Sequence, residues 1–154
     1  MAHIVYTRFT SNDTKDGTKY SLGGLYVRPI ITLVSSDALK LIKKKNREAI
    51  VPGKGIDYAK LKVSVAGVTR EHVIPVEALY QHLDDMGDRL TERIIRKMMP
   101  KLEIAIITKD QNQKLKEAGL NSAMPEGWWQ RKNLDPLERY RCANLLDSIW
   151  AKEF

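Results

Sequence analysis

Cysteine is almost absent from this sequence: Cys142 is the only one among 154 residues. A single cysteine excludes an intramolecular disulfide, and it also excludes the paired cysteines of many structural zinc sites. Cys142 falls beside Leu145 and Leu146 on the apolar stripe of a predicted C-terminal helix, so we expect it to lie in the core. The chain is therefore predicted to fold without covalent cross-links.

Long apolar runs are missing as well. No segment approaches the ~18 apolar residues of a membrane span, and the N-terminal MAHIVYTRF lacks the basic region and apolar run of a signal peptide. Hydrophobic residues make up 43% of the chain and charged residues 29%, as in ordinary water-soluble proteins. We expect a cytoplasmic protein with no membrane partner.

Internal repeats and low-complexity linkers are not found, so the sequence predicts one domain over 1–154. Strands are predicted before and after groups of helices, but strands and helices do not alternate regularly as in βαβ units. This order indicates an α+β fold: a small antiparallel or mixed sheet packed with four to six helices. The expected parts are N-terminal strands over 1–34, a basic helix over 35–50, a strand–strand–helix unit with a helical insertion over 61–119, and a tryptophan-containing loop and helix over 120–154.

Four segments are predicted as strands from their β-branched and aromatic residues or from their alternating pattern. HIVYTRF and LYVRPIITLV are joined by a turn-rich loop, and Pro29 places the second of them at a sheet edge. VPGKGID is predicted as a loop, and KLKVSVAG after it alternates like a strand with Leu61, Val63 and Val65 on one face. LEIAIIT is short and apolar, as in a buried strand.

Helix boundaries are marked by capping residues. Ser35 or Ser36 can cap a helix through DALKLIKKKNREAI, and Thr108 with Gln111 forms a capping box for the helix KDQNQKLKEAG. The spacing of Val76, Leu79, Tyr80 and Leu83 predicts an amphipathic helix that ends near Gly87. Asp88 is expected to cap a further helix that ends before Pro100, and Asp135 is expected to cap the last helix of the chain.

Positive charge exceeds negative charge, with 26 Lys and Arg against 19 Asp and Glu, for a net charge of +7. Such an excess favours nucleic acid or another acidic partner. The densest run lies on the basic helix, and it is interpreted either as a solvated helix face or as a phosphate-contacting surface. Its members are Lys40, Lys43, Lys44, Lys45 and Arg47.

Two adjacent tryptophans, Trp128 and Trp129, stand in a loop beside Arg131 and Lys132. Aromatic rings with neighbouring cations stack bases and hold phosphates, or anchor a protein partner. The alternative is that at least one tryptophan folds back onto the core, because exposed tandem tryptophans are unfavourable. A nucleic acid or a nucleoprotein complex is the expected partner of this segment.

Glu71 and His72 stand together between a predicted strand and Pro75. Histidine titrates near neutral pH and suits proton transfer, while a glutamate offers an orienting hydrogen bond or a hard oxygen ligand for Mg²⁺. Neighbouring residues on a strand point to opposite faces, so both reach one site only where the strand ends or bends. The alternative is a strand end in which His72 donates to a backbone carbonyl.

The element Glu71-His72-Val73-Ile74-Pro75 resembles the acid-His-x-x-Pro element of HNH, or ββα-metal, nucleases, and ITKDQNQKL is similar to their later strand-to-helix element. The resemblance implies that Glu71 and Asn112 hold a divalent metal and that His72 is the general base against a phosphodiester. The implied cofactor is Mg²⁺ or Mn²⁺, with no organic cofactor. Glu71 replaces the usual aspartate, and no final family histidine follows Asn112.

Three functions follow as hypotheses. The first is a small metal-dependent HNH-like endonuclease with His72 as base. The second is a non-catalytic phage or mobile-element protein that binds and inhibits a host nucleic-acid-handling complex, and the third is a non-specific nucleic-acid-binding module. Of the other histidines, His82 is expected to be solvated, and His3 is expected to be a strand residue without a role.

Overall fold

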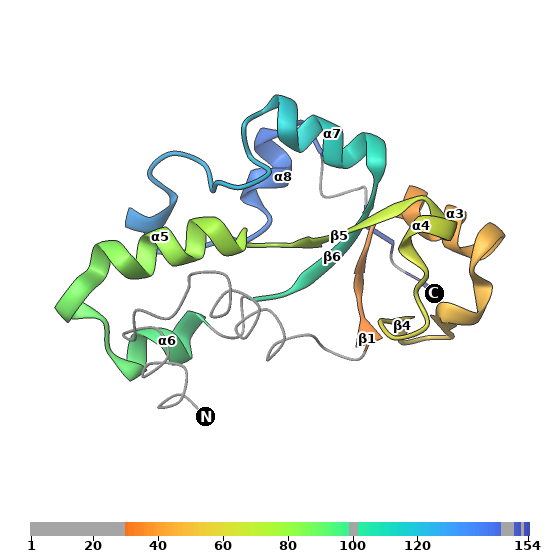
Figure 1. Ribbon diagram of the computed structural model, residues 1–154, viewed down its shortest axis with the longest axis horizontal. Coiled ribbons are helices and arrows are strands. Elements are labelled where there is room, and N and C mark those ends of the chain that lie inside the picture. Colours follow the sequence, from red (N-terminus) through yellow and green to blue (C-terminus); the bar gives the residue numbers. More distant parts are fainter. Residues whose placement is uncertain (1–29, 99–101, 146–149, 152) are drawn as a thin grey trace.

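The computed structural model describes residues 30–98, 102–145, 150–151 and 153–154. The predicted strand HIVYTRF, His3, Pro29 and Pro100 lie outside these residues. In the described part, six α-helices accompany two three-stranded sheets, which confirms the α+β prediction. The helices α5 and α6 lie at one end of the molecule, α3 and α4 lie at the other, and β5 and β6 run between them (Figure 1).

The predicted second strand contributes to both sheets, because it is interrupted at Thr32. Its first part is an edge of an antiparallel sheet, and its second part pairs in parallel with the central strand of the other sheet. The first sheet has the order β1 (Ile30–Ile31), β4 (Gly55–Asp57), β3 (Ile50–Val51). The second has the order β2 (Leu33–Val34), β6 (Ile104–Thr108), β5 (Val68–His72).

Helix α3 (Ser36–Lys45) begins at Ser35, whose hydroxyl accepts a hydrogen bond from the backbone N–H of Ala38 at 3.1 Å. The helix is shorter than predicted, because it ends at Asn46 and a 3-10 turn η1 (Arg47–Ala49) follows. Its apolar side is buried in the core while its lysines face outward. The basic helix face is therefore exposed, as both interpretations of this segment require.

The strand predicted for KLKVSVAG was wrong, because residues Val63–Ala66 form the short helix α4. The Asn46 side chain accepts a hydrogen bond from the backbone N–H of Lys62 at 2.6 Å, which holds the start of this helix against the end of α3. Val65 is 52% exposed, so the alternating residues do not define a buried face. Tertiary contacts have overridden a short alternating pattern here.

The segment predicted as the loop VPGKGID is a hairpin between β3 and β4. Gly55 has a φ of +142°, and a Cβ at this position would stand 2.3 Å from the carbonyl oxygen of Ile31. Only glycine allows β1 and β4 to approach this closely.

The predicted helical hairpin is present as α5 (Val76–Met86), the 3-10 turn η2 (Gly87–Arg89) and α6 (Glu92–Met98). Asp88 was wrongly predicted to cap the second helix, since it lies within η2. The hydroxyl of Thr91 instead accepts a hydrogen bond from the N–H of Ile94 at 3.4 Å. The hairpin buries Leu79 and Leu83 of α5, Leu90 after η2 and Ile95 of α6 in one cluster with Trp128.

Strand β6 and helix α7 (Lys109–Glu117) are joined by the predicted capping box of Thr108 and Gln111. The Gln111 side-chain oxygen also accepts a 2.7 Å hydrogen bond from the hydroxyl of Ser35. The starts of α3 and α7 are therefore tied together by one buried amide.

The last helix, α8 (Glu138–Cys142), is a short one. Asp135 does not cap it directly, because its carboxylate accepts from the N–H of Leu137 and closes the turn before the helix. Cys142 was wrongly predicted to be a core residue; it is exposed. The helix is rotated so that Arg139, Tyr140 and Ala143 face the interior instead.

Candidate functional site

The pairing of β5 with β6 determines where the Glu71-His72 pair points. Glu71 is opposite Ala105, and His72 is opposite Ile104. Ala105 belongs to the core cluster formed with α7 and α8, whereas Ile104 packs against the cluster that contains α3. Cross-strand partners share a face of the sheet. Glu71 and His72 therefore project from opposite faces, as expected for adjacent residues of a regular strand.

Glu71 lies against Arg139 of α8, whose side chain has no solvent exposure. The Arg139 Nη2 donates to the Glu71 Oε2 at 2.6 Å and to the backbone carbonyl of His72 at 2.7 Å. Its Nη1 donates to the carbonyl of Leu120 at 2.7 Å. The guanidinium also lies 4.9 Å from the Tyr140 ring centroid and within 3.2 Å of its hydroxyl. One buried arginine thus joins the end of β5, the segment after α7, and α8.

His72 is half-buried at the same strand end. Burial lowers the pKa of its imidazole below the usual 6.5, and the positive charge of Arg139 lowers this pKa further. A lowered pKa keeps the imidazole neutral at physiological pH, which is the protonation state of a general base. The environment therefore suits the base role chemically, whereas the direction of the side chain separates it from Glu71.

Asn112 lies on α7, which packs on the same face of the sheet as Glu71 through Leu115. Its side-chain Oδ1 is buried, and it has no hydrogen-bond partner among the described residues. The structure does not bring Asn112 into a hydrogen bond with Glu71 or His72. In the described ranges, no group of three or more His, Cys, Asp and Glu residues could hold a metal ion. Metal binding at Glu71 and Asn112 remains a prediction.

The tandem tryptophans have different environments. Trp128 has no exposed surface, and its indole N–H donates to the carbonyl of Asp135 at 2.9 Å. Trp129 is half-buried, and its ring stacks on His82 with centroids 3.9 Å apart and planes inclined by 9°. The prediction that one tryptophan folds onto the core is confirmed. His82 was expected to be solvated; it is half-buried, because the Trp129 ring covers one face of its imidazole.

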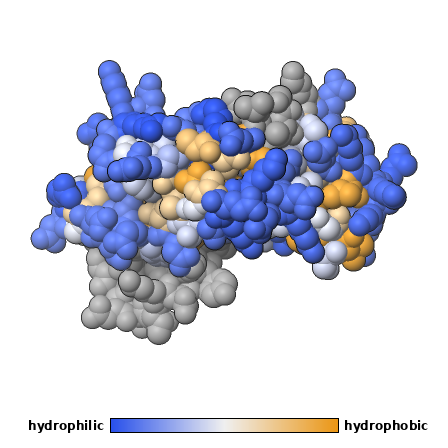
Figure 2. Space-filling view, turned by 90° about the horizontal axis from the view of Figure 1, so that it is seen from above, coloured by the Kyte–Doolittle hydropathy of each residue, from blue (hydrophilic) through white to orange (hydrophobic). Residues whose placement is uncertain are grey.

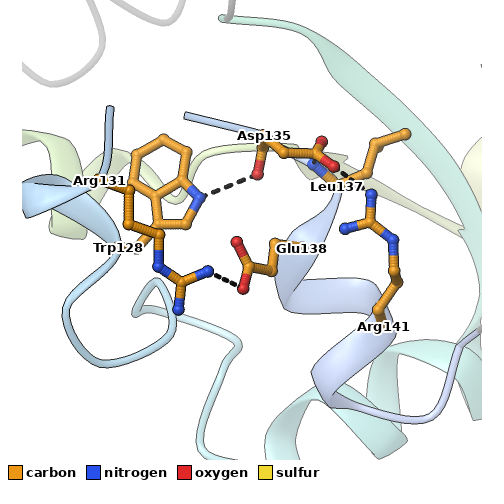
Figure 3. A network of polar contacts seen from close by, with 6 residues as sticks. All are labelled: Trp128, Arg131, Asp135, Leu137, Glu138 and Arg141. Carbon is orange, nitrogen blue, oxygen red and sulfur yellow. Dashed lines mark hydrogen bonds and ion pairs between the residues drawn. The ribbon is translucent and has the colours of Figure 1, made fainter. Parts of the chain in front are cut away.

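The cations near these tryptophans are engaged in ion pairs (Figure 3). Arg131 pairs with Glu138, and Arg141 pairs with Asp135 on the other side of the loop. Lys132 is exposed. Two of the positive charges near the tryptophans are thus paired with Glu138 and Asp135, which weakens the attraction of this region for a polyanion.

The positive charge of the protein is concentrated in residues 30–70, here called the basic lobe. This lobe contains nine Lys and Arg against three Asp and Glu, a net charge of +6 out of +7 for the whole chain. It comprises the first sheet, β2, α3, α4 and the start of β5. Figure 2 shows a largely hydrophilic surface at the end that contains α3 and α4, with a small hydrophobic area.

Some cations of the basic lobe have partners. Lys40, Lys60 and Lys62 form ion pairs with Asp37, Asp57 and Glu48, at 3.0, 3.7 and 3.5 Å respectively. Arg70 lies 4.1 Å from the Tyr58 ring centroid and donates to two backbone carbonyls.

The other cations of the lobe are exposed, and no acidic side chain of the described residues forms an ion pair with them. They are Lys43, Lys44, Lys45, Arg47 and Lys54.

Arg139 is the main residue whose role the sequence did not reveal. In the sequence it is one of several cations that follow the tryptophans, yet it is fully buried. One signal was present: Arg139 precedes the buried Ala143 by one helical turn, so both share a side of α8. Charged residues are rarely buried unless paired, and the pairing partner Glu71 is distant in sequence.

Comparisons with protein-family models, curated proteins and solved structures give no match. Within the described residues, no helix combines the length and apolar character that a bilayer span requires.

Proposed function

We propose that this protein binds nucleic acid through the basic lobe, with phosphate contacts from the exposed cations at the end of α3. The observation that carries the proposal is the concentration of +6 charge in residues 30–70, together with exposed lysines that lack acidic partners in the described structure. Phosphate contacts by Lys and Arg supply most of the affinity of sequence-independent nucleic-acid binding. The tryptophan loop is a weaker candidate, because Arg131 and Arg141 are already paired.

The proposal is tested by exchanging three exposed lysines of α3, in the variant Lys43→Gln/Lys44→Gln/Lys45→Gln. Glutamine keeps most of the helix propensity of lysine, so the change acts mainly on charge. A matched control removes the same charge elsewhere, in Lys109→Gln/Lys114→Gln/Lys116→Gln on the exposed side of α7.

Binding is measured by fluorescence anisotropy of a labelled oligonucleotide, with circular dichroism to verify folding of both variants. We expect the α3 variant to lose most of its affinity and the α7 control to stay close to wild type. Equal losses in the two variants would show that overall charge, rather than the basic lobe, controls binding, and the proposal would then fail.

A second candidate is metal-dependent cleavage at the end of β5. It is supported by the order of elements β5, helical hairpin, β6, α7, in which two antiparallel strands are followed by a helix, and by the lowered pKa of His72. For Glu71 to ligate a metal, its carboxylate has to exchange the contact with Arg139 for the ion.

Cleavage is tested on single- and double-stranded DNA and RNA with Mg²⁺ or Mn²⁺, beside an EDTA control. The nuclease hypothesis requires metal-dependent cleavage that His72→Ala abolishes while nucleic-acid binding persists. Intact substrate in every lane with wild-type protein would refute the nuclease and leave the binding proposal in place.

A further inference from the structure

We infer that the ligand of the basic lobe is a nucleic-acid duplex, held by its phosphate backbone without selection of sequence. This inference rests on the proposed function and adds the class of nucleic acid to it. Three features of the lobe support it: the burial of its aromatic side chains, the kind of side chain on the exposed face of α3, and the spacing of the cations.

The first feature is the lack of an available stacking platform. Among the described residues, Tyr58 is the aromatic residue of positions 30–70, and Phe154 packs against the core cluster of the same lobe. Both side chains are half-buried, and the Arg70 guanidinium lies over the Tyr58 ring at 4.1 Å. Sites for single strands combine a basic groove with aromatic rings on which successive bases stack. In the described part of the lobe, the cations are exposed while both rings are half-buried, and this combination fits a duplex whose bases are already stacked on one another.

The second feature is the exposed face of α3, which carries lysines and Asp37. Lysine is a flexible point charge, whereas amide side chains read adenine through paired hydrogen bonds. The nearest amide, Asn46, is fully buried, and its oxygen is occupied by the backbone N–H of Lys62. The face is thus equipped to contact phosphates and poorly equipped to read base edges.

The third feature is the spacing of the cations along α3. Lys43, Lys44 and Lys45 are consecutive within the last turn of the helix, and Lys40, one turn earlier, is already paired with Asp37. One helical turn advances about 5.4 Å, while phosphates of one duplex strand advance about 3.4 Å along the axis. The three unpaired lysines have flexible side chains, so they reach successive phosphates of one strand.

The experiment compares a duplex with each of its separated strands, and an AT-rich with a GC-rich duplex of equal length, as DNA and as RNA. We expect at least tenfold tighter binding to a duplex than to its single strands, and dissociation constants of the two sequences within threefold of each other. Binding to DNA duplex, RNA duplex or both supports the inference, and the comparison identifies which backbone is preferred.

The salt dependence provides an independent measure. Contacts from Lys43, Lys44, Lys45 and Arg47 predict a slope of log K against log salt of about −3.6, which is roughly a 150-fold loss of affinity between about 50 and 200 mM salt. The triple glutamine variant of α3 keeps one of these four contacts, so its affinity should fall only about 3.5-fold over the same range.

The outcomes separate this inference from the proposed function. Single strands bound as tightly as duplex, or a more than tenfold preference for one sequence, would overturn the inference while the proposed function stands. If no nucleic acid shows salt-dependent binding, both are refuted.

Discussion

The buried ion pair between Arg139 and Glu71 allows a quantitative test of how the end of β5 is held. The perturbation is Arg139→Met, which keeps an unbranched apolar stem and removes the charge and all donors. The carbonyls of Leu120 and His72 then lose their closest side-chain donor, and the carboxylate of Glu71, whose side chain is 17% exposed, loses its partner.

The expected loss follows from these contacts. Breaking a buried pair by removing one partner costs about 3–5 kcal/mol, mainly because the remaining polar groups stay buried and unpaired. Partial exposure of Glu71 reduces this value, so we expect Arg139→Met to lower the free energy of unfolding by about 3 kcal/mol. For a chain of this size, that loss corresponds to a decrease in Tm of roughly 6–12 °C.

Urea unfolding followed by circular dichroism measures the loss directly, and Arg139→Lys provides a second variant in case the methionine variant does not fold. Lysine keeps the charge but lacks the planar fork that reaches several acceptors at once, so an intermediate loss is expected. Glu71→Gln and the double variant Glu71→Gln/Arg139→Met complete a thermodynamic cycle with a coupling of about 1–3 kcal/mol.

Two results would refute the reasoning. A loss below about 1 kcal/mol for Arg139→Met would mean that the guanidinium contributes no more than an exposed charge. Additive losses in the cycle would mean that Glu71 and Arg139 do not stabilise one another, and the carboxylate would then be free for another role such as metal binding.

Three further predictions concern other parts of the molecule. Because the folded state lowers the pKa of His72 below 6.5, the free energy of unfolding should decrease as pH falls below about 6.5 toward the folded-state pKa. His72→Gln should flatten that decrease, and a decrease identical to that of wild type would exclude His72 as its source. Trp128→Ala should cost about 3–5 kcal/mol because the indole is fully buried, whereas Trp129→Ala should cost clearly less; equal values in thermal unfolding would contradict this order. Gln111→Ala should cost about 1–3 kcal/mol because the hydroxyl of Ser35 and the capping box lose their acceptor, and an unchanged urea midpoint would refute the shared cap.

The elements that were predicted correctly have strong local signals. The helix over Val76–Met86 follows from a full amphipathic period and a glycine at its end, and the start of α7 follows from the capping box of Thr108 and Gln111. The strand before α7 is a short apolar run rich in β-branched residues. In each case the favourable contacts or backbone preferences lie within one element, so its own residues are sufficient to predict it.

The errors lie where partners are distant in sequence. KLKVSVAG has a convincing alternation, yet its backbone is held as α4 by Asn46, which lies 16 positions before Lys62. Cys142 shares a helix with apolar residues, but the orientation of α8 is set by the burial of Arg139 and Tyr140. A short periodic pattern does not determine which side of an element faces the core when a buried charge competes for that side.

At the candidate site, too, local features could be predicted from the sequence, whereas contacts between distant residues could not. By itself, the sequence determined that Glu71 and His72 are neighbours shortly before Pro75, and that positive charge is densest near Lys43–Lys45, because residue identity is sufficient for both. The strand that ends at His72 was not predicted in its place, since the expected strand KLKVSVAG is largely the helix α4 and β5 begins at Val68. Only the tertiary structure decided that Glu71 meets Arg139, 68 positions away, and that His72 points to the opposite face. The physical reason is that a buried guanidinium must find its acceptors wherever the packed strands and helices place them.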